Sequence, residues 1–93
     1  MLYTEKILEE VRAMGSLGYS LARMIILIEP ADHLQFMQDF NDTTSEIYIE
    51  YKKGIISAEY EIDKKLFENA KNGDVTAIEQ LEVRRINRNL NES

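Results

Sequence analysis

The sequence predicts an all-α protein in which three short helices precede a long helical hairpin. Over residues 43–74, apolar side chains recur at steps of three and four, which places them on one face of a single long helix. This face consists of Ile47, Tyr51, Ile55, Ala58, Ile62, Leu66 and Ala70. Shorter apolar runs, separated by glycine or proline, precede the long helix, and no stretch shows the sustained alternation of a strand.

The first two helices are predicted on either side of a glycine-containing turn. Residues 2–14 form the first helix, and its apolar face comprises Ile7, Leu8, Val11 and Met14. Two glycines within residues 15–18 indicate that this helix breaks there. Ser20 is placed to cap a second helix over residues 21–28. Because this helix is apolar on nearly every side, we expect it to be mostly buried.

A third helix is predicted after the Glu29-Pro30 corner. The residue before a proline is disfavoured in the helical conformation, so the second helix ends at this corner. Pro30 itself suits the first turn of the next helix, which runs to about Asn41. The residues expected to face the core are Leu34, Met37 and either Phe36 or Phe40. Those expected to face water are Asp32, Gln35, Gln38 and Asp39.

The long helix has a start signal and a stop signal. Thr43 and Glu46 fit a capping box, in which a hydroxyl and a carboxylate satisfy the first free backbone N–H groups. Lys71 and Gly73 predict the end, since a cation suits the negative helix terminus and glycine tolerates positive φ. Asp74 is expected to cap a final helix. The apolar face of that helix comprises Val75, Ile78, Leu81, Ile86 and Leu90.

The predicted organisation is a three-helix unit at residues 1–42 and a helical hairpin at residues 43–93, with no linker between them. The hairpin is the expected oligomerisation region, because 93 residues support only a thin core. The absence of cysteine excludes disulfides and thiolate metal sites. The longest apolar run, residues 24–28, is too short to span a bilayer, and the N-terminus lacks a signal-peptide pattern. We therefore expect a soluble, cytoplasmic protein.

The charge is unevenly distributed along the chain. The formal net charge is −6, and the segment from Pro30 to Tyr51 contains five acidic residues and no Lys or Arg. Positive charge is concentrated near the C-terminus, in Arg84, Arg85 and Arg88. Since phosphate contacts supply most non-specific affinity for nucleic acid, any DNA contact has to be local or multiplied by assembly.

The sequence offers little catalytic chemistry. His33 beside Asp32 could form a base with its orienting carboxylate or a metal site, but an ordinary surface or helix-terminal histidine is favoured, since no nucleophile or second histidine accompanies the pair. The acids of residues 32–46 lack the spacing of a calcium loop, and the glycines form no phosphate-binding pattern. We therefore expect no enzyme, no metal and no cofactor.

Gly54 and the tyrosines each have two interpretations. Gly54 lies inside the long helix, where it marks either the close approach of another helix, such as one from a second subunit, or a kink. Tyr48, Tyr51 and Tyr60 could stack on nucleic-acid bases, but at helical spacing they are more typical of a core or an interface.

Helix-turn-helix is the functional motif that the pattern favours. Residues 20–28, the Glu29-Pro30 corner and residues 31–41 have its layout, in which the second helix enters the major groove while the first braces it. Gln35, Gln38 and Asn41 could then bond to base edges. A plain three-helix core is the alternative.

Two segments carry a family resemblance. The opening GYSLARMIILI is followed by a cadence Y..G...AE.E....L...A..GD..A, whose members are Tyr51, Gly54, Ala58, Glu59, Glu61, Leu66, Ala70, Gly73, Asp74 and Ala77. Over roughly residues 17–82 the chain resembles small terminase subunits and related phage helix-turn-helix proteins. The resemblance implies recognition of phage DNA, assembly through the later helices, and delivery of the DNA to a large ATP-hydrolysing motor subunit in a bacterial host cell.

The leading hypothesis is a non-enzymatic phage or prophage DNA-binding module that oligomerises. Its candidate DNA contacts are Arg23, Gln35, Gln38, Asn41, Lys52, Lys53, Arg84, Arg85 and Arg88. Its candidate oligomer interface is Tyr48, Tyr51, Ile55, Ala58, Ile62 and Leu66. The alternative is an acidic helical module that binds protein rather than DNA.

Overall fold

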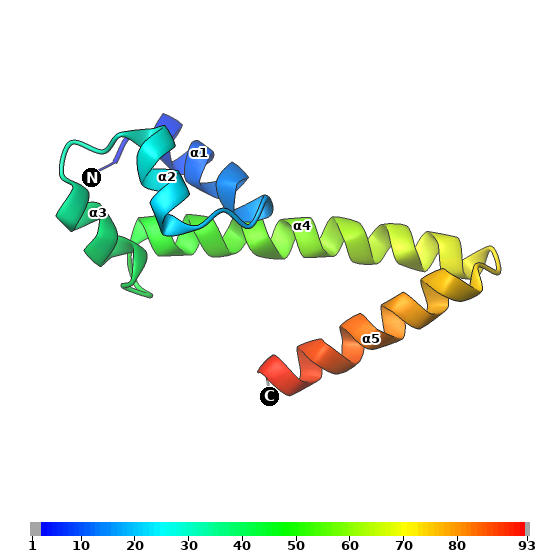
Figure 1. The fold of residues 1–93 in the computed structure, drawn as a ribbon. Coiled ribbons are helices and arrows are strands. Elements are labelled where there is room, and N and C mark those ends of the chain that lie inside the picture. Colours follow the sequence, from blue (N-terminus) through cyan, green and yellow to red (C-terminus); the bar gives the residue numbers. More distant parts are fainter. Residues whose placement is uncertain (1–2, 93) are drawn as a thin grey trace. The chain divides into compact units, whose positions relative to one another are not determined.

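The described part of the chain, residues 3–92, is helical throughout, apart from short connections and turns, in the computed structural model (Figure 1). It contains no strand, so the predicted all-α class is confirmed. The helices are α1 (Glu5–Ser16), α2 (Leu21–Ile28), α3 (His33–Phe40), α4 (Glu46–Lys71) and α5 (Val75–Glu92). In this part of the chain, none of them has the length and apolar character needed to cross a membrane.

The chain divides into two compact units, Met1–Glu59 and Tyr60–Ser93, and α4 contributes to both. The core of the first unit takes side chains from four helices, and its buried members are Leu8, Val11, Met24, Phe36 and Ile47. Figure 1 shows α1, α2 and α3 gathered around the beginning of α4. Ile47 of α4 belongs to this core, and the division falls after Glu59; the sequence suggested a boundary between residues 42 and 43.

Helix α1 has the predicted apolar face but a different end. Leu8 and Val11 are buried, and Ile7 and Met14 pack against the same core. The helix continues through Gly15 and ends at Ser16, two residues later than expected but within the predicted break at residues 15–18. Gly15 is buried against the backbone of α4, and the turn is made by Gly18, whose φ of +70° favours glycine.

Helix α2 has the predicted bounds and cap. The Ser20 hydroxyl accepts a hydrogen bond from the Arg23 N–H at 3.2 Å. The helix ends at Ile28, and its C-cap Glu29 adopts a left-handed conformation with φ of 52° before Pro30. The expectation that α2 is mostly buried was wrong. Only Met24 is fully buried, while other apolar side chains reach solvent, namely Ile26 (73% exposed) and Leu27 (56% exposed). In a unit this small, the neighbouring helices cover only one face of α2.

Helix α3 begins later than predicted. Asp32 is its N-cap and accepts a hydrogen bond from the Gln35 N–H at 3.0 Å, so Pro30 lies in the connection and not in the first turn. Phe36 is the fully buried residue of this helix. The expectation that Leu34 and Met37 face the core was wrong, because both are exposed. Phe36, one of the two phenylalanines expected to face the core, is buried in it, and Phe40 packs against it.

Helix α4 is capped by Ser45 rather than by the predicted box of Thr43 and Glu46. The Ser45 hydroxyl accepts from the Tyr48 N–H at 3.1 Å and donates to the backbone carbonyl of Asp39. The helix ends at Lys71 as predicted. Figure 1 shows the turn that follows, in yellow, where Gly73 has a φ of +91°.

The second unit is formed by the last part of α4 and by α5. The Asp74 carboxylate accepts from the Ala77 N–H at 3.1 Å, which confirms the predicted cap of α5. Ala77 and Leu81 are buried. The predicted apolar face of α5 was right for Leu81 and wrong for four of its members, which are exposed: Val75, Ile78, Ile86 and Leu90. In a hairpin of two helices, each helix covers only one face of the other, and the remaining faces stay exposed.

Candidate nucleic-acid interface

The surface of α2 contains the first predicted DNA contact. Arg23 is exposed, and its guanidinium lies 4.9 Å from the centre of the Tyr19 ring, within cation–π range. Both residues line a shallow hollow together with Ser20, Ile26 and Leu27. This surface therefore combines one cation with apolar side chains, a composition that suits a protein partner as well as a phosphate backbone.

The predicted base-reading amides of α3 are exposed, but two of the three have local hydrogen bonds. Gln35 donates through Nε2 to Asp39 Oδ1 at 2.9 Å. Asn41 donates through Nδ2 to the carbonyl of Met37 at 2.9 Å, at the end of the helix. Gln38 is exposed on the outer face. A base edge would have to replace the hydrogen bonds of Gln35 and Asn41. Among the hydrogen bonds described, none of this kind has to be replaced at Gln38.

Two carboxylates give this side of the unit a negative character. Asp39 accepts the hydrogen bond of the Tyr3 hydroxyl as well as that of Gln35. Burial raises the pKa of Tyr3, and the bond to Asp39 and the charges of Asp39 and Asp32 raise it further. The phenol therefore stays protonated and donates to Asp39 throughout the physiological pH range.

The two lysines of α4 are exposed beside an acidic residue. Lys53 lies 3.4 Å from Glu50, and Glu50 also accepts from Arg12 Nε at 2.7 Å. The hydrogen bond from Arg12 lowers the pKa of Glu50, so this carboxylate is ionised at neutral pH. Lys52 is exposed as well. Lys52 and Lys53 are available to phosphates, although the local potential of Lys53 is reduced by Glu50.

The arginines of α5 are divided between two settings. Arg84 Nε and Arg88 Nη2 each lie 2.6 Å from one oxygen of Asp63 on α4. Burial of Asp63 opposes its ionisation, but the hydrogen bonds from the two arginines outweigh it and lower the pKa of Asp63. Arg85 pairs at 2.9 Å with Glu82, and both side chains are more than half exposed. Arg85 is thus the most accessible cation of the three.

The predicted interface residues lie in two different environments. Tyr51 belongs to the first unit: its ring centre is 5.0 Å from that of Phe40, and its hydroxyl donates to the carbonyl of Tyr19 at 2.7 Å. Ile62 and Leu66 line a hollow of the second unit that faces α5. The remaining three, Tyr48, Ile55 and Ala58, are half-buried. Their role in assembly stays a prediction.

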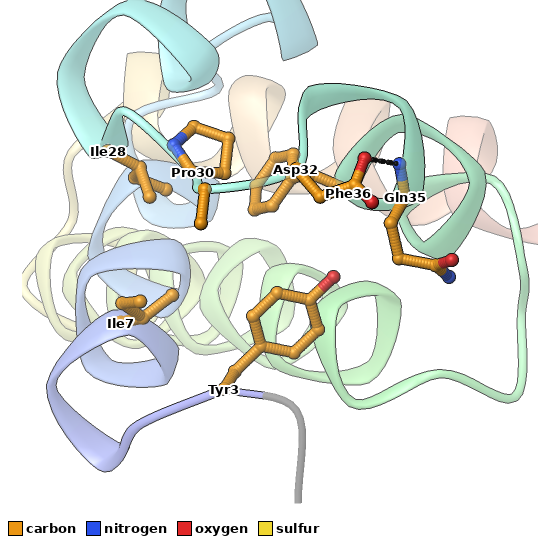
Figure 2. A pocket seen from close by; sticks show the side chains of 8 residues that line it. Tyr3, Ile7, Ile28, Pro30, Asp32, Gln35 and Phe36 are labelled. Carbon is orange, nitrogen blue, oxygen red and sulfur yellow. Dashed lines mark hydrogen bonds between the residues drawn. The ribbon is translucent and has the colours of Figure 1, made fainter.

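A further concave feature was not anticipated from the sequence. We call it the α1–α3 pocket; its volume is about 430 Å³, and Figure 2 shows its side chains. Apolar walls come from Ile7, Ile28, Pro30 and Phe36, and polar groups from Tyr3 and Asp32. The sequence indicated the Pro30 corner and gave Phe36 as a candidate core residue, but the contact of both with α1 depends on tertiary packing.

The structure thus leaves most of the predicted DNA contacts exposed and engages Arg84 and Arg88 with Asp63. Asp63 is the residue that sequence reasoning missed, because 21 and 25 residues separate it from its partners. Within residues 3–92, no group of three or more His, Asp or Glu side chains is placed to hold a metal ion. Comparison with protein-family models, with curated proteins and with solved structures finds no match for the chain.

Proposed function

We propose that this chain is a non-enzymatic DNA-binding module of phage or prophage origin, similar to terminase small subunits, that recognises DNA for packaging and acts as an assembly of copies. The observation that carries the proposal is the pair α2 and α3. Each has eight residues and its own side-chain cap, and only residues 29–32 separate them. This order of two short helices and a short connection supports a helix-turn-helix unit, in which the second helix enters the major groove.

The exposed polar groups of α3 support this proposal. Gln38 and Gln35 project amides that can bond to adenine edges, and Arg23 on α2 is exposed for a phosphate contact. Among the other predicted contacts, the exposed cations are Lys52, Lys53 and Arg85. These few contacts have to overcome a net charge of −6 on each copy. Binding therefore needs several copies, because linked weak contacts raise the overall affinity.

The proposed partners follow from the resemblance stated above. They are double-stranded DNA, further copies of the chain, and a large ATP-hydrolysing motor subunit in the cytoplasm of a bacterial host. No cofactor is part of the proposal.

A second candidate function is an acidic protein-interaction module that does not bind DNA. Two observations favour it. Asp63 engages Arg84 and Arg88, and α2 exposes Ile26 and Leu27, which are apolar where a DNA-binding surface would gain from cations. The two candidates differ in one measurable property, which is affinity for a DNA duplex.

The test is the binding of a fluorescent DNA duplex across a salt series, measured by anisotropy. The DNA-binding proposal expects affinity that falls with salt, and a weaker slope for the double variant Lys52→Glu with Lys53→Glu, by about one for each lost phosphate contact. Reversing Arg84 and Arg85 to Glu should also weaken binding. Lys65→Glu, an exposed charge on α4 outside the predicted set, is the matched control. Absence of binding at low salt would reject the proposal in favour of the interaction module.

A further inference from the structure

The α1–α3 pocket combines apolar walls with an acidic rim. Phe36 is fully buried at its base, and Ile7 and Ile28 face it from α1 and α2 (Figure 2). Asp32 is exposed at the edge, and Asp39 lies close enough to bond with the Tyr3 hydroxyl. From Pro30 to Tyr51 the chain carries five acidic residues and no Lys or Arg. An apolar group accompanied by a positive charge is therefore the complementary ligand.

The end of α5 presents that chemistry. Val83, Ile86 and Leu90 are exposed at 55%, 55% and 73%, and their spacing of three and four residues places them on one face of the helix. The opposite face carries the buried Ala77 and Leu81. Residues 83–91 contain three arginines and no acidic residue. Arg85, next to Ile86, pairs with Glu82, and this exposed pair contributes little.

We propose that the end of α5 from one copy of the chain docks into the α1–α3 pocket of a second copy. Ile86 and Leu90 enter between the apolar walls, and Arg85 faces Asp32. An amphipathic helix that places i and i+4 side chains in an apolar hollow is a common recognition mode. The pocket volume, about 430 Å³, lies in the range of binding cavities.

The same sequence supplies both complementary halves, and this identifies the occupant as a second copy. Each copy offers its pocket to one neighbour and its α5 to another, so the contact is head to tail and generates closed rings or open chains. The inference rests on the assembly part of the proposed function and is independent of DNA binding.

A charge-swap experiment tests the contact through the solution mass, measured by light scattering. The first variant, Ala31→Lys with Asp32→Asn, makes the pocket rim positive and retains an N-cap for α3, since asparagine caps as well as aspartate. The second variant, Arg85→Glu, makes the end of α5 less basic. We expect the wild type to give a multiple of 10.8 kDa and each variant alone to fall to 10.8 kDa.

Mixing the two variants in equal amounts should restore the wild-type mass. The positive rim of the first faces the carboxylate that Arg85→Glu introduces in the second, and the unaltered rim of the second accepts the basic α5 of the first. Misfolding cannot produce this recovery. Ile86→Ser with Leu90→Ser should also give a monomer, whereas Val75→Ser, at an equally exposed position at the start of α5, should retain the wild-type mass.

The outcomes separate this contact from the proposed function. A wild-type oligomer whose mass is unchanged in either charge variant, or a mixture that fails to regain the mass, overturns the contact and leaves assembly intact. A wild type that remains at 10.8 kDa at every concentration overturns both the contact and the assembly part of the proposed function.

Discussion

Gly54 of α4 lies directly against the backbone carbonyl of Arg12 in α1. A Cβ atom at Gly54 would overlap that carbonyl oxygen and would approach the Ser16 nitrogen to 2.9 Å. Gly15 has the reciprocal relationship, since its Cβ would overlap the carbonyl oxygen of Tyr51. The two helices therefore meet backbone to backbone. Of the two interpretations of Gly54, close approach is correct, and the approaching helix belongs to the same chain.

We predict that Gly54→Ala destabilises the protein. Alanine gains about 1 kcal/mol in helix propensity, but the added methyl group has only backbone to displace, and such overpacking costs about 3 kcal/mol or more. The net loss should be about 2 kcal/mol in the free energy of unfolding, measured by urea denaturation and circular dichroism. Ser57→Ala, at an exposed position one turn later, is the control and should change stability by less than about 0.5 kcal/mol. A Gly54→Ala variant as stable as the wild type would contradict the close crossing.

Tyr51 links α4 by a hydrogen bond to the connection before α2. Its hydroxyl donates to the Tyr19 carbonyl at 2.7 Å in a half-buried setting. Tyr51→Phe leaves that carbonyl without this donor and should lower stability by about 1 kcal/mol. Tyr60→Phe removes a hydroxyl from a ring that is 60% exposed and should have almost no effect. Equal effects of the two changes, measured by thermal unfolding, would argue against this bond.

The start of α4 depends on Ser45. Because its hydroxyl caps Tyr48 and also bonds to the Asp39 carbonyl, Ser45→Ala should lower stability by about 1 kcal/mol. Thr43→Ala is the matched control, at the position that the sequence favoured as the cap, and it should leave stability within about 0.5 kcal/mol of the wild type. Urea denaturation of both variants measures the difference. A larger loss of stability from Thr43→Ala than from Ser45→Ala would instead support the capping box of Thr43 and Glu46.

Asp63 should make the second unit sensitive to acid. Its pKa is lowered in the folded protein, so its contribution is fully present above the ordinary aspartate pKa of about 3.9 and is lost as the pH falls through the lowered value. Asp63→Asn should reduce the melting temperature at pH 7, with a loss of about 1 kcal/mol for this partly exposed cluster.

The difference between Asp63→Asn and the wild type should shrink as the pH falls below 3.9, approximately the ordinary aspartate value. Glu61→Gln provides the control, because Glu61 is 68% exposed and lies 3.7 Å from Lys64. Thermal unfolding followed by circular dichroism at several pH values measures both variants. A difference that persists unchanged at low pH would show that charge on Asp63 is not its source.

The sequence by itself determined the helical class, the number of helices and most helix ends. These features depend on neighbours in the chain: Ser20 caps Leu21–Ile28, Asp74 caps α5, and Gly73 permits the turn between α4 and α5. Each signal acts within four residues, so it can be read without knowing the fold.

Only the tertiary structure decided which apolar residues are covered and which charges are paired. Ile26 is more hydrophobic than Met24, yet Ile26 is exposed and Met24 is buried, because burial depends on which neighbouring helix is present on that side. Asp63 and its arginines meet through the hairpin, and Gly54 meets Arg12 through a crossing of α1 and α4. Contacts between residues this far apart are fixed by packing, which local propensity does not encode.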